Sequence, residues 1–62
     1  MEQHTKAETE MTLLIVDDDQ PFLTRLSRAM EQRGFDVSIA STVADGLQSI
    51  ERRAPAYAII DL

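Results

Sequence analysis

Two short aliphatic runs that end in aspartate constrain the fold of this chain more than any other feature. Residues 13–16 read LLIV and are followed by DDD, and residues 57–60 read YAII and are followed by Asp61. An uninterrupted apolar run of this length with β-branched members is typical of a strand buried on both faces of a parallel sheet. The two runs therefore predict two strands whose carboxyl ends both carry acidic side chains.

A helix is predicted over residues 21–33. Pro21 suits the first helical position, where a missing N–H costs nothing, and either Asp19 or Gln20 can cap the helix. Gly34 follows as a left-handed stop. Apolar residues recur every three or four positions and form one stripe, of which we expect Phe22, Leu26 and Met30 to be core. The stripe comprises Phe22, Leu23, Leu26, Ala29 and Met30.

Residues 35–39 alternate between apolar and polar side chains, which predicts a strand with one face more exposed, at an edge of the sheet. Thr42 followed by Asp45 fits the capping box of a second helix, which ends near Arg52 and Arg53. We expect the apolar stripe of this helix to be core as well. That stripe comprises Val43, Leu47 and Ile50.

Two further residues, Gly46 and Pro55, affect the elements predicted in this half of the chain. Gly46 inside the second helix costs roughly 1 kcal/mol relative to alanine, and Pro55 breaks the chain before the last strand. The order strand, helix, strand, helix, strand, with short connections, predicts an α/β fold with a parallel sheet and right-handed crossovers. Ligands of such sheets bind at the carboxyl ends of the strands, beside the point where the strand order reverses.

If the spatial order of the strands is 2-1-3, the first and third strands are neighbours about 4.8 Å apart. Asp17, Asp18 and Asp61 then converge, although they are far apart in the sequence. Such carboxylates repel one another unless a cation neutralises them, and their hard oxygen atoms suit Mg²⁺ or Mn²⁺. A carboxylate beside such a metal is also a workable nucleophile for phosphoryl transfer. The simpler alternative, which we prefer for Asp19, is that these residues only cap a helix or end a strand.

The charge balance excludes several classes of partner. Six basic and eleven acidic residues give a formal net charge of −5, which disfavours broad contact with nucleic acid or an anionic membrane. No apolar run is long enough to span a bilayer and no secretory signal is evident, so we interpret the protein as cytoplasmic. His4 is expected to be a solvated tail residue. The arginines are expected to face solvent on the helices: Arg25, Arg28, Arg33, Arg52 and Arg53.

Residues 13–35, LLIVDDDQPFLTRLSRAMEQRGF, and residues 55–62, PAYAIIDL, closely resemble the N-terminal half of response-regulator receiver domains. The sequences of these two segments further resemble the RegA/PrrA/ActR group of redox-responsive two-component regulators. The resemblance implies a flavodoxin-like (CheY-like) fold, of which this chain carries the β-α-β-α-β half. We therefore expect a flexible N-terminal tail over residues 1–11 and a truncated receiver over 12–62. We also expect these 62 residues to lack the C-terminal DNA-binding domain of that group, so that any contact with DNA would be made by that further domain.

The resemblance also assigns roles to the acidic residues. Asp18 and Asp61 would bind Mg²⁺ directly, Asp17 would hold it mainly through water, and Asp61 would accept the phosphoryl group from a sensor histidine kinase. The domain would be a signalling module that catalyses only its own phosphorylation, not a turnover enzyme. Receivers also use a hydroxyl residue, a lysine and the carbonyl of residue 63, which lie beyond Leu62. We therefore expect weak metal binding and little stable phosphorylation for these residues alone.

Three further expectations concern assembly and rival functions. The third strand would expose an unpaired edge and uncovered aliphatic surface, so we expect a dimer or higher oligomer that pairs third strands or exchanges elements. A rival function is a haloacid-dehalogenase-type phosphatase with Asp17 as nucleophile and Asp19 as acid. That family favours a small hydroxyl residue where this chain has Pro21, and it gives no role to Asp61. The other rival is a dimerising half-domain without phosphochemistry.

Overall fold

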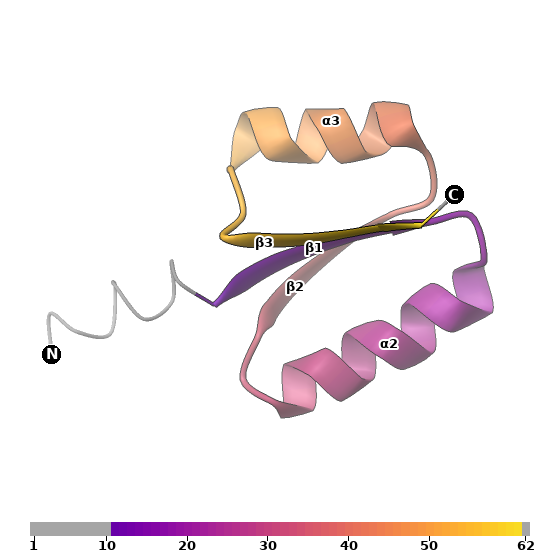
Figure 1. The fold of residues 1–62 in the computed structure, drawn as a ribbon, viewed down its shortest axis with the longest axis vertical. Coiled ribbons are helices and arrows are strands. Elements are labelled where there is room, and N and C mark those ends of the chain that lie inside the picture. Colours follow the sequence, from indigo (N-terminus) through magenta and orange to yellow (C-terminus); the bar gives the residue numbers. More distant parts are fainter. Residues whose placement is uncertain (1–10, 62) are drawn as a thin grey trace, which may run out of the picture.

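A three-stranded parallel sheet lies between two helices in the computed structural model, which describes residues 11–61 (Figure 1). The predicted tail, with His4, lies almost entirely outside the described residues, as does Leu62. The predicted order of elements is confirmed, and their ends shift by about one residue. The elements are β1 (Thr12–Asp17), α2 (Gln20–Gln32), β2 (Asp36–Ala40), α3 (Val43–Arg52) and β3 (Tyr57–Asp61).

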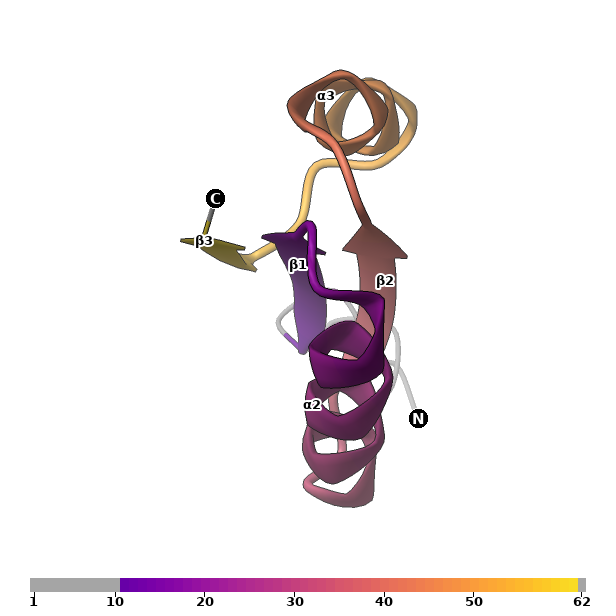
Figure 2. The same cartoon turned by 90° about the vertical axis from the view of Figure 1, so that its right-hand side faces the viewer.

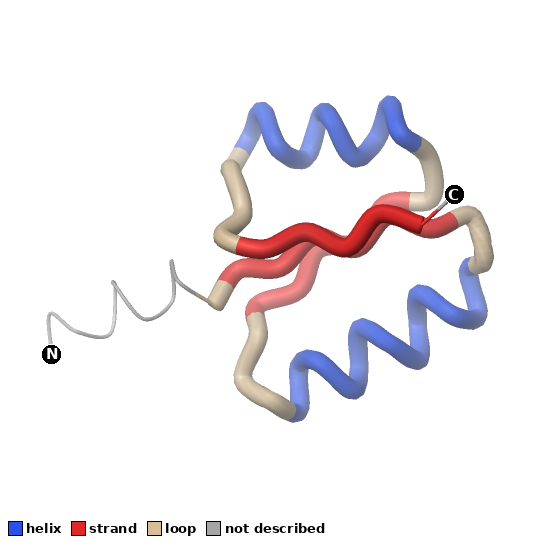
Figure 3. Tube along the Cα trace, in the orientation of Figure 1, coloured by secondary structure: helices blue, strands red, loops and turns tan. Residues whose placement is uncertain are grey.

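The strands lie in the order β2-β1-β3, which confirms the predicted half of a flavodoxin-like sheet. Connections between helices and strands are short (Figure 3). The two helices cover opposite faces of the sheet, and each contacts β1 and β2. Viewed at a right angle, β3 projects beyond both helices, with neither of them over it (Figure 2). The fold therefore has a well-covered centre and one bare side.

The core lies on the two faces of β1. Leu13 and Ile15 pack with Leu23 beneath α2, while Leu14 and Val16 form a separate cluster beneath α3. Every residue of β1 is buried. The prediction that the first aliphatic run is buried on both faces is therefore confirmed.

Both ends of α2 follow the predicted signals. The choice between the two candidate caps is settled, because the backbone N–H of Phe22 donates to the Asp19 carboxylate at 3.1 Å. Gly34 has a φ of 95°, a left-handed conformation that side chains other than glycine rarely adopt. Its N–H donates to the Glu31 carbonyl at 3.0 Å, which ends the helix.

The start of α3 and its glycine have separate explanations. The N–H of Asp45 donates to the Thr42 hydroxyl at 3.1 Å, as the capping box predicts. Gly46 is buried, and a Cβ placed there would lie 3.0 Å from Cγ2 of Val16. A side chain at this position would therefore crowd β1. The glycine allows α3 to approach the sheet closely, which offsets its low helix propensity.

Several residues that we predicted to be core are exposed instead. Val43 is 50% exposed and Leu47 is 56% exposed. All of β3 is exposed, which confirms the expectation that the third strand of a truncated receiver leaves its aliphatic surface uncovered. The physical reason is that both helices lie over β1 and β2, so neither covers β3. Val43 and Leu47 line a shallow apolar hollow together with Ile60, which nothing fills within residues 11–61. The other residues that we predicted to be core are half-buried: Phe22, Leu26, Met30 and Ile50.

Candidate functional site

The acidic residues predicted as a site meet at one end of the sheet. Asp17 ends β1, Asp61 ends β3, and the two are register partners in neighbouring parallel strands. Asp18 and Asp19 lie in the turn between β1 and α2. Together with Phe22, these four residues line an open cavity of about 340 Å³. The structure therefore brings together all three residues that we predicted as a metal and phosphoacceptor site.

The side chains of this acidic cavity differ in how firmly they are held. Asp17 is only 6% exposed, and its Oδ1 accepts a hydrogen bond from the N–H of Asp19 at 2.9 Å. Asp18 and Asp61 are exposed. One carboxylate is therefore fixed by the fold, and two stand in solvent, where they are free to turn toward a ligand.

Asp19 has a structural task in this arrangement. One of its carboxylate oxygens accepts the hydrogen bond from Phe22 that caps α2. The N–H of Asp19 in turn binds Asp17, so the turn holds β1 and the helix start together. This supports the interpretation of Asp19 as a cap. The same hydrogen bond to Asp17 does not favour that residue as the nucleophile of a phosphatase, because it occupies one of its oxygens.

The cavity carries negative charge that the described part of the chain does not neutralise. None of its four carboxylates forms an ion pair with another residue of the range 11–61. The ion pair that does form joins Arg53 to Asp36 at 2.9 Å, at the other end of the sheet. A cation therefore suits this cavity in sign, and the oxygen donors suit a hard ion such as Mg²⁺.

The match to a metal site is one of donor type and position. Within residues 11–61 the side chains do not form a ready-made group of three metal ligands. Asp17 is held in place by its hydrogen bond, whereas Asp18 and Asp61 are exposed, so a shared ion would have to order both of them. A site assembled in this way would bind metal more weakly than a rigid one, since ordering the side chains costs conformational entropy.

One residue important to the site was missed by sequence reasoning. Thr12 is buried, and its hydroxyl accepts a hydrogen bond from the N–H of Ala56 at 2.9 Å. This bond ties the segment before β3 to the start of β1. Because β3 has only five residues, fixing its start also helps to place Asp61 beside Asp17. A lone threonine at the head of an aliphatic strand is the signal that could have drawn attention to it.

The fold and its acidic end match the class of protein that the sequence resembles. A parallel sheet of order 2-1-3, with an aspartate at the carboxyl end of both β1 and β3, is consistent with the half receiver that the resemblance implies. Within residues 11–61 no helix is long and apolar enough to cross a membrane.

Comparison with known proteins supports the same group. The photosynthetic apparatus regulatory protein RegA of Rhodobacter capsulatus is 54% identical over 61 residues, which are 98% of this chain and 33% of RegA. The acid tolerance regulatory protein ActR of Sinorhizobium medicae is 57% identical over 53 residues, 86% of this chain and 27% of ActR. RegA of Cereibacter sphaeroides is 53% identical over 53 residues, 86% of this chain and 29% of that protein.

The chain thus spans about a third or less of the length of these relatives. No family model matches it, and no solved structure matches it. The predicted resemblance is confirmed: the chain is similar, over nearly all of its length, to the N-terminal part of response regulators of the RegA and ActR group.

Proposed function

We propose that this chain is the phosphoacceptor part of a two-component response regulator, in which Asp61 takes a phosphoryl group from a sensor histidine kinase. One observation carries the proposal: Asp17 and Asp61 are register partners at the carboxyl ends of adjacent parallel strands and border one cavity. The similarity to RegA and ActR supports a regulatory role rather than a turnover enzyme.

The chemistry of Asp61 is a direct displacement at phosphorus. A carboxylate oxygen of Asp61 forms the new P–O bond while the P–N bond of the kinase phosphohistidine breaks, and the imidazole nitrogen keeps the bonding electrons. Asp61 is exposed at the tip of its strand, so a second protein can reach it. The hydrogen bond between Ala56 and Thr12 fixes the other end of the strand, which limits the motion of the nucleophile.

A divalent cation, Mg²⁺ or Mn²⁺, belongs to this proposal. Asp18 and Asp61 would hold it directly and Asp17 mainly through water, as the family resemblance implies. When bound, the cation would offset the negative charge of the phosphoryl group and of the carboxylates. We expect weak binding by the 62-residue chain, because its carboxylates do not form a preassembled group of three ligands within residues 11–61.

The remaining partners follow from the same regulatory role. The kinase is the expected donor, and any contact with DNA would be made by a further domain of a transcriptional regulator, in the cytoplasm. The acidic balance of this chain, −5 in formal charge, fits an acceptor module better than a DNA-binding one.

Self-association through β3 is a further part of the proposal. Ile60 is 62% exposed, Tyr57 and Ile59 are also exposed, and β3 pairs on one side with β1 within residues 11–61. An exposed apolar strand with an unpaired edge tends to pair with another strand. We propose that the 62-residue chain covers β3 with a second copy, in a dimer or higher oligomer.

The phosphoacceptor is tested by chemical trapping. The chain is incubated with acetyl phosphate and Mg²⁺ and then reduced with borohydride, which converts an aspartyl phosphate to homoserine and so records even a short-lived product. Peptide mass spectrometry is expected to find homoserine at position 61. Asp61→Asn should abolish the signal, and the matched control Asp45→Asn, which changes an exposed carboxylate outside the cavity, should retain it. Homoserine at position 17 would favour the phosphatase, and no homoserine anywhere would contradict the proposal.

A further inference from the structure

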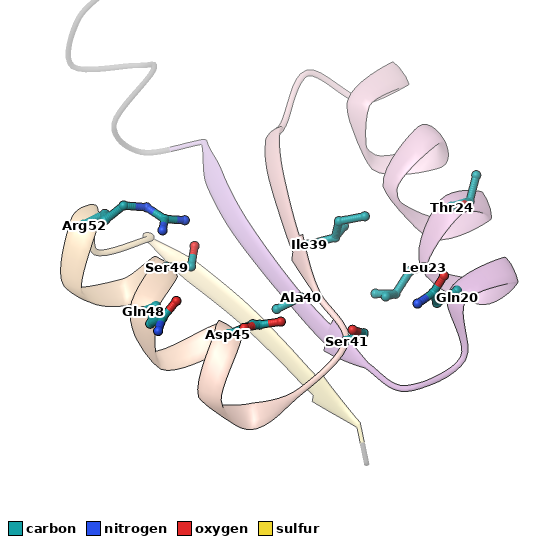
Figure 4. Close-up of a pocket in the computed structure, with 10 residues that line it drawn as sticks. All are labelled: Gln20, Leu23, Thr24, Ile39, Ala40, Ser41, Asp45, Gln48, Ser49 and Arg52. Atoms are coloured by element: carbon teal, nitrogen blue, oxygen red, sulfur yellow. The ribbon is translucent and has the colours of Figure 1, made fainter.

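A groove of about 460 Å³ runs along the outer edge of β2 (Figure 4). The N-terminal half of α2 forms one wall and α3 forms the other, with β2 between them. It lies apart from the acidic cavity and shares no lining residue with it. The residues that line the groove include Gln20, Thr24, Ile39, Asp45, Gln48 and Arg52.

The floor of this groove is an open strand edge. Within residues 11–61, β2 pairs with β1 on one side and with nothing on the other. Ile39 is 50% exposed, although its register partner Ile15 is fully buried. Such an edge presents backbone N–H and C=O groups to any strand that can approach it. The groove therefore has the chemistry to accept one more strand.

The wall formed by α3 carries opposite charges at its two ends. Asp45 and Arg52 are seven residues, or about two helical turns, apart, so they lie on the same side of α3. The ion pair between Arg53 and Asp36 places the end of α3 beside the start of β2. Asp45 consequently lies near the end of β2. Neither Asp45 nor Arg52 forms an ion pair with another residue of the range 11–61.

This distribution of charge is self-complementary. Ser38 is the middle residue of β2. A two-fold axis perpendicular to the sheet and midway between the Ser38 residues of two adjacent β2 strands would place these strands antiparallel. Val37 of one copy would then lie opposite Ile39 of the second copy and cover it. The same rotation would bring Arg52 of each copy beside Asp45 of the other. Both new ion pairs follow from one symmetry operation.

The helices leave room for this arrangement. Each helix lies over β1 and β2 rather than outside the sheet edge (Figure 2). With strands spaced about 4.8 Å, equivalent helices of the two copies would lie about 10 Å apart. That separation falls in the usual range for packed helices. The α3 helices would therefore pack side by side, with Gln48 near the axis.

We propose that the edge of β2 is an interface between two copies of this chain. The two sheets join into one sheet of six strands, held by backbone hydrogen bonds between the β2 strands and by two Asp45 to Arg52 ion pairs. The inference goes beyond the phosphoacceptor function and uses neither Asp61 nor β3. The partner that fits this groove is a second copy of the chain, because the two-fold rotation places Asp45 of each copy beside Arg52 of the other.

Charge reversal tests the interface. Association of the 62-residue chain is measured by sedimentation velocity over a range of concentrations. Asp45→Arg and Arg52→Asp should each weaken it on the order of tenfold, because each variant sets two like charges against each other. An equimolar mixture of the two variants should restore the association, since every arginine then meets an aspartate across the interface. The chain with both substitutions should also associate like the original.

The controls separate this result from a loss of folding, and all variants are compared in an Ile60→Lys background, in which pairing through exposed β3 is weakened. Glu51→Arg reverses an exposed charge on α3 outside the groove and should leave the association unchanged. Circular dichroism reports whether each variant is folded. If a single variant is unfolded, the test rests on whether the doubly substituted chain associates like the original. Unchanged association in both single variants would overturn the proposal. So would a mixture, or a doubly substituted chain, that associates no better than the single variants.

Discussion

The two edges of the sheet differ in what surrounds them. The β2 edge lies in a groove between α2 and α3, and charged and polar side chains line it. The β3 edge has neither helix over it, and apolar residues project from both of its faces (Figure 2). The comparison shows that a strand's sequence sets its capacity for burial, whereas the path of the connecting helices decides which strands become buried.

The difference arises from the connections. α2 links β1 to β2, and α3 returns from β2 across β1 to reach β3. Both helices therefore lie over β1 and β2, and within residues 11–61 β3 is left without a helix over it. The same connections place Asp17 and Asp61 side by side, so the bare strand is also the one that carries the proposed phosphoacceptor.

The largest effect is expected at the strand that supports both edges. Ile15→Ala removes a fully buried side chain from the middle of β1, and large-to-small changes of this kind cost about 3 kcal/mol. A chain of this size has little stability to lose. Urea unfolding followed by circular dichroism should show a largely unfolded variant, and association at both edges should disappear. A stably folded Ile15→Ala chain would contradict the description of the core.

A smaller effect is expected at the bare edge alone. Ile60→Lys places a charge on an exposed apolar residue of β3, so the unfolding free energy should change by less than about 0.5 kcal/mol. Association through β3 should weaken by about tenfold, because the buried area lost is apolar. The measurement is made in the Asp45→Arg background, where the β2 edge is not expected to pair. Unchanged association of this variant would show that β3 does not contribute to self-association.

A third effect, on stability, concerns α3, which lies between the polar groove at β2 and the apolar side of β3. Gly46→Ala should destabilise the fold by about 1 kcal/mol, because crowding against Val16 outweighs the gain in helix propensity. Thermal unfolding of Gly46→Ala, Val16→Ala and the doubly substituted chain measures the coupling. In the Val16→Ala background the substitution at Gly46 should be tolerated or stabilising. Stabilisation in the original background would show that Val16 moves aside.

Local sequence signals were sufficient for the elements of this fold. The aliphatic run before Asp17 predicted β1, and Gly34 and Thr42 marked the end of α2 and the start of α3. These signals work because capping and turn formation depend on a few neighbouring residues. The convergence of Asp17 and Asp61 could also be predicted from the sequence, because the carboxyl ends of all strands in a parallel sheet lie at the same end of the sheet.

Burial and close packing could not be predicted in the same way. An apolar stripe such as Val43 and Leu47 shows which face of a helix is apolar, but not whether another element covers it. The contact between Gly46 and Val16 depends on how closely α3 approaches the sheet. The hydrogen bond from Ala56 to Thr12 joins residues far apart in the sequence. Each of these is a property of tertiary structure that no local pattern encodes.

Paramagnetic broadening by Mn²⁺ tests the central claim, that the acidic ends of β1 and β3 share one cation. Amide signals of the 62-residue chain are followed by NMR while Mn²⁺ is added in small amounts. The signals of Asp18 and Asp61 should broaden together at the same Mn²⁺ concentration, and Asp18→Asn should protect both. Broadening of Asp18 that leaves Asp61 sharp, or broadening that does not depend on Asp18, would contradict a shared site.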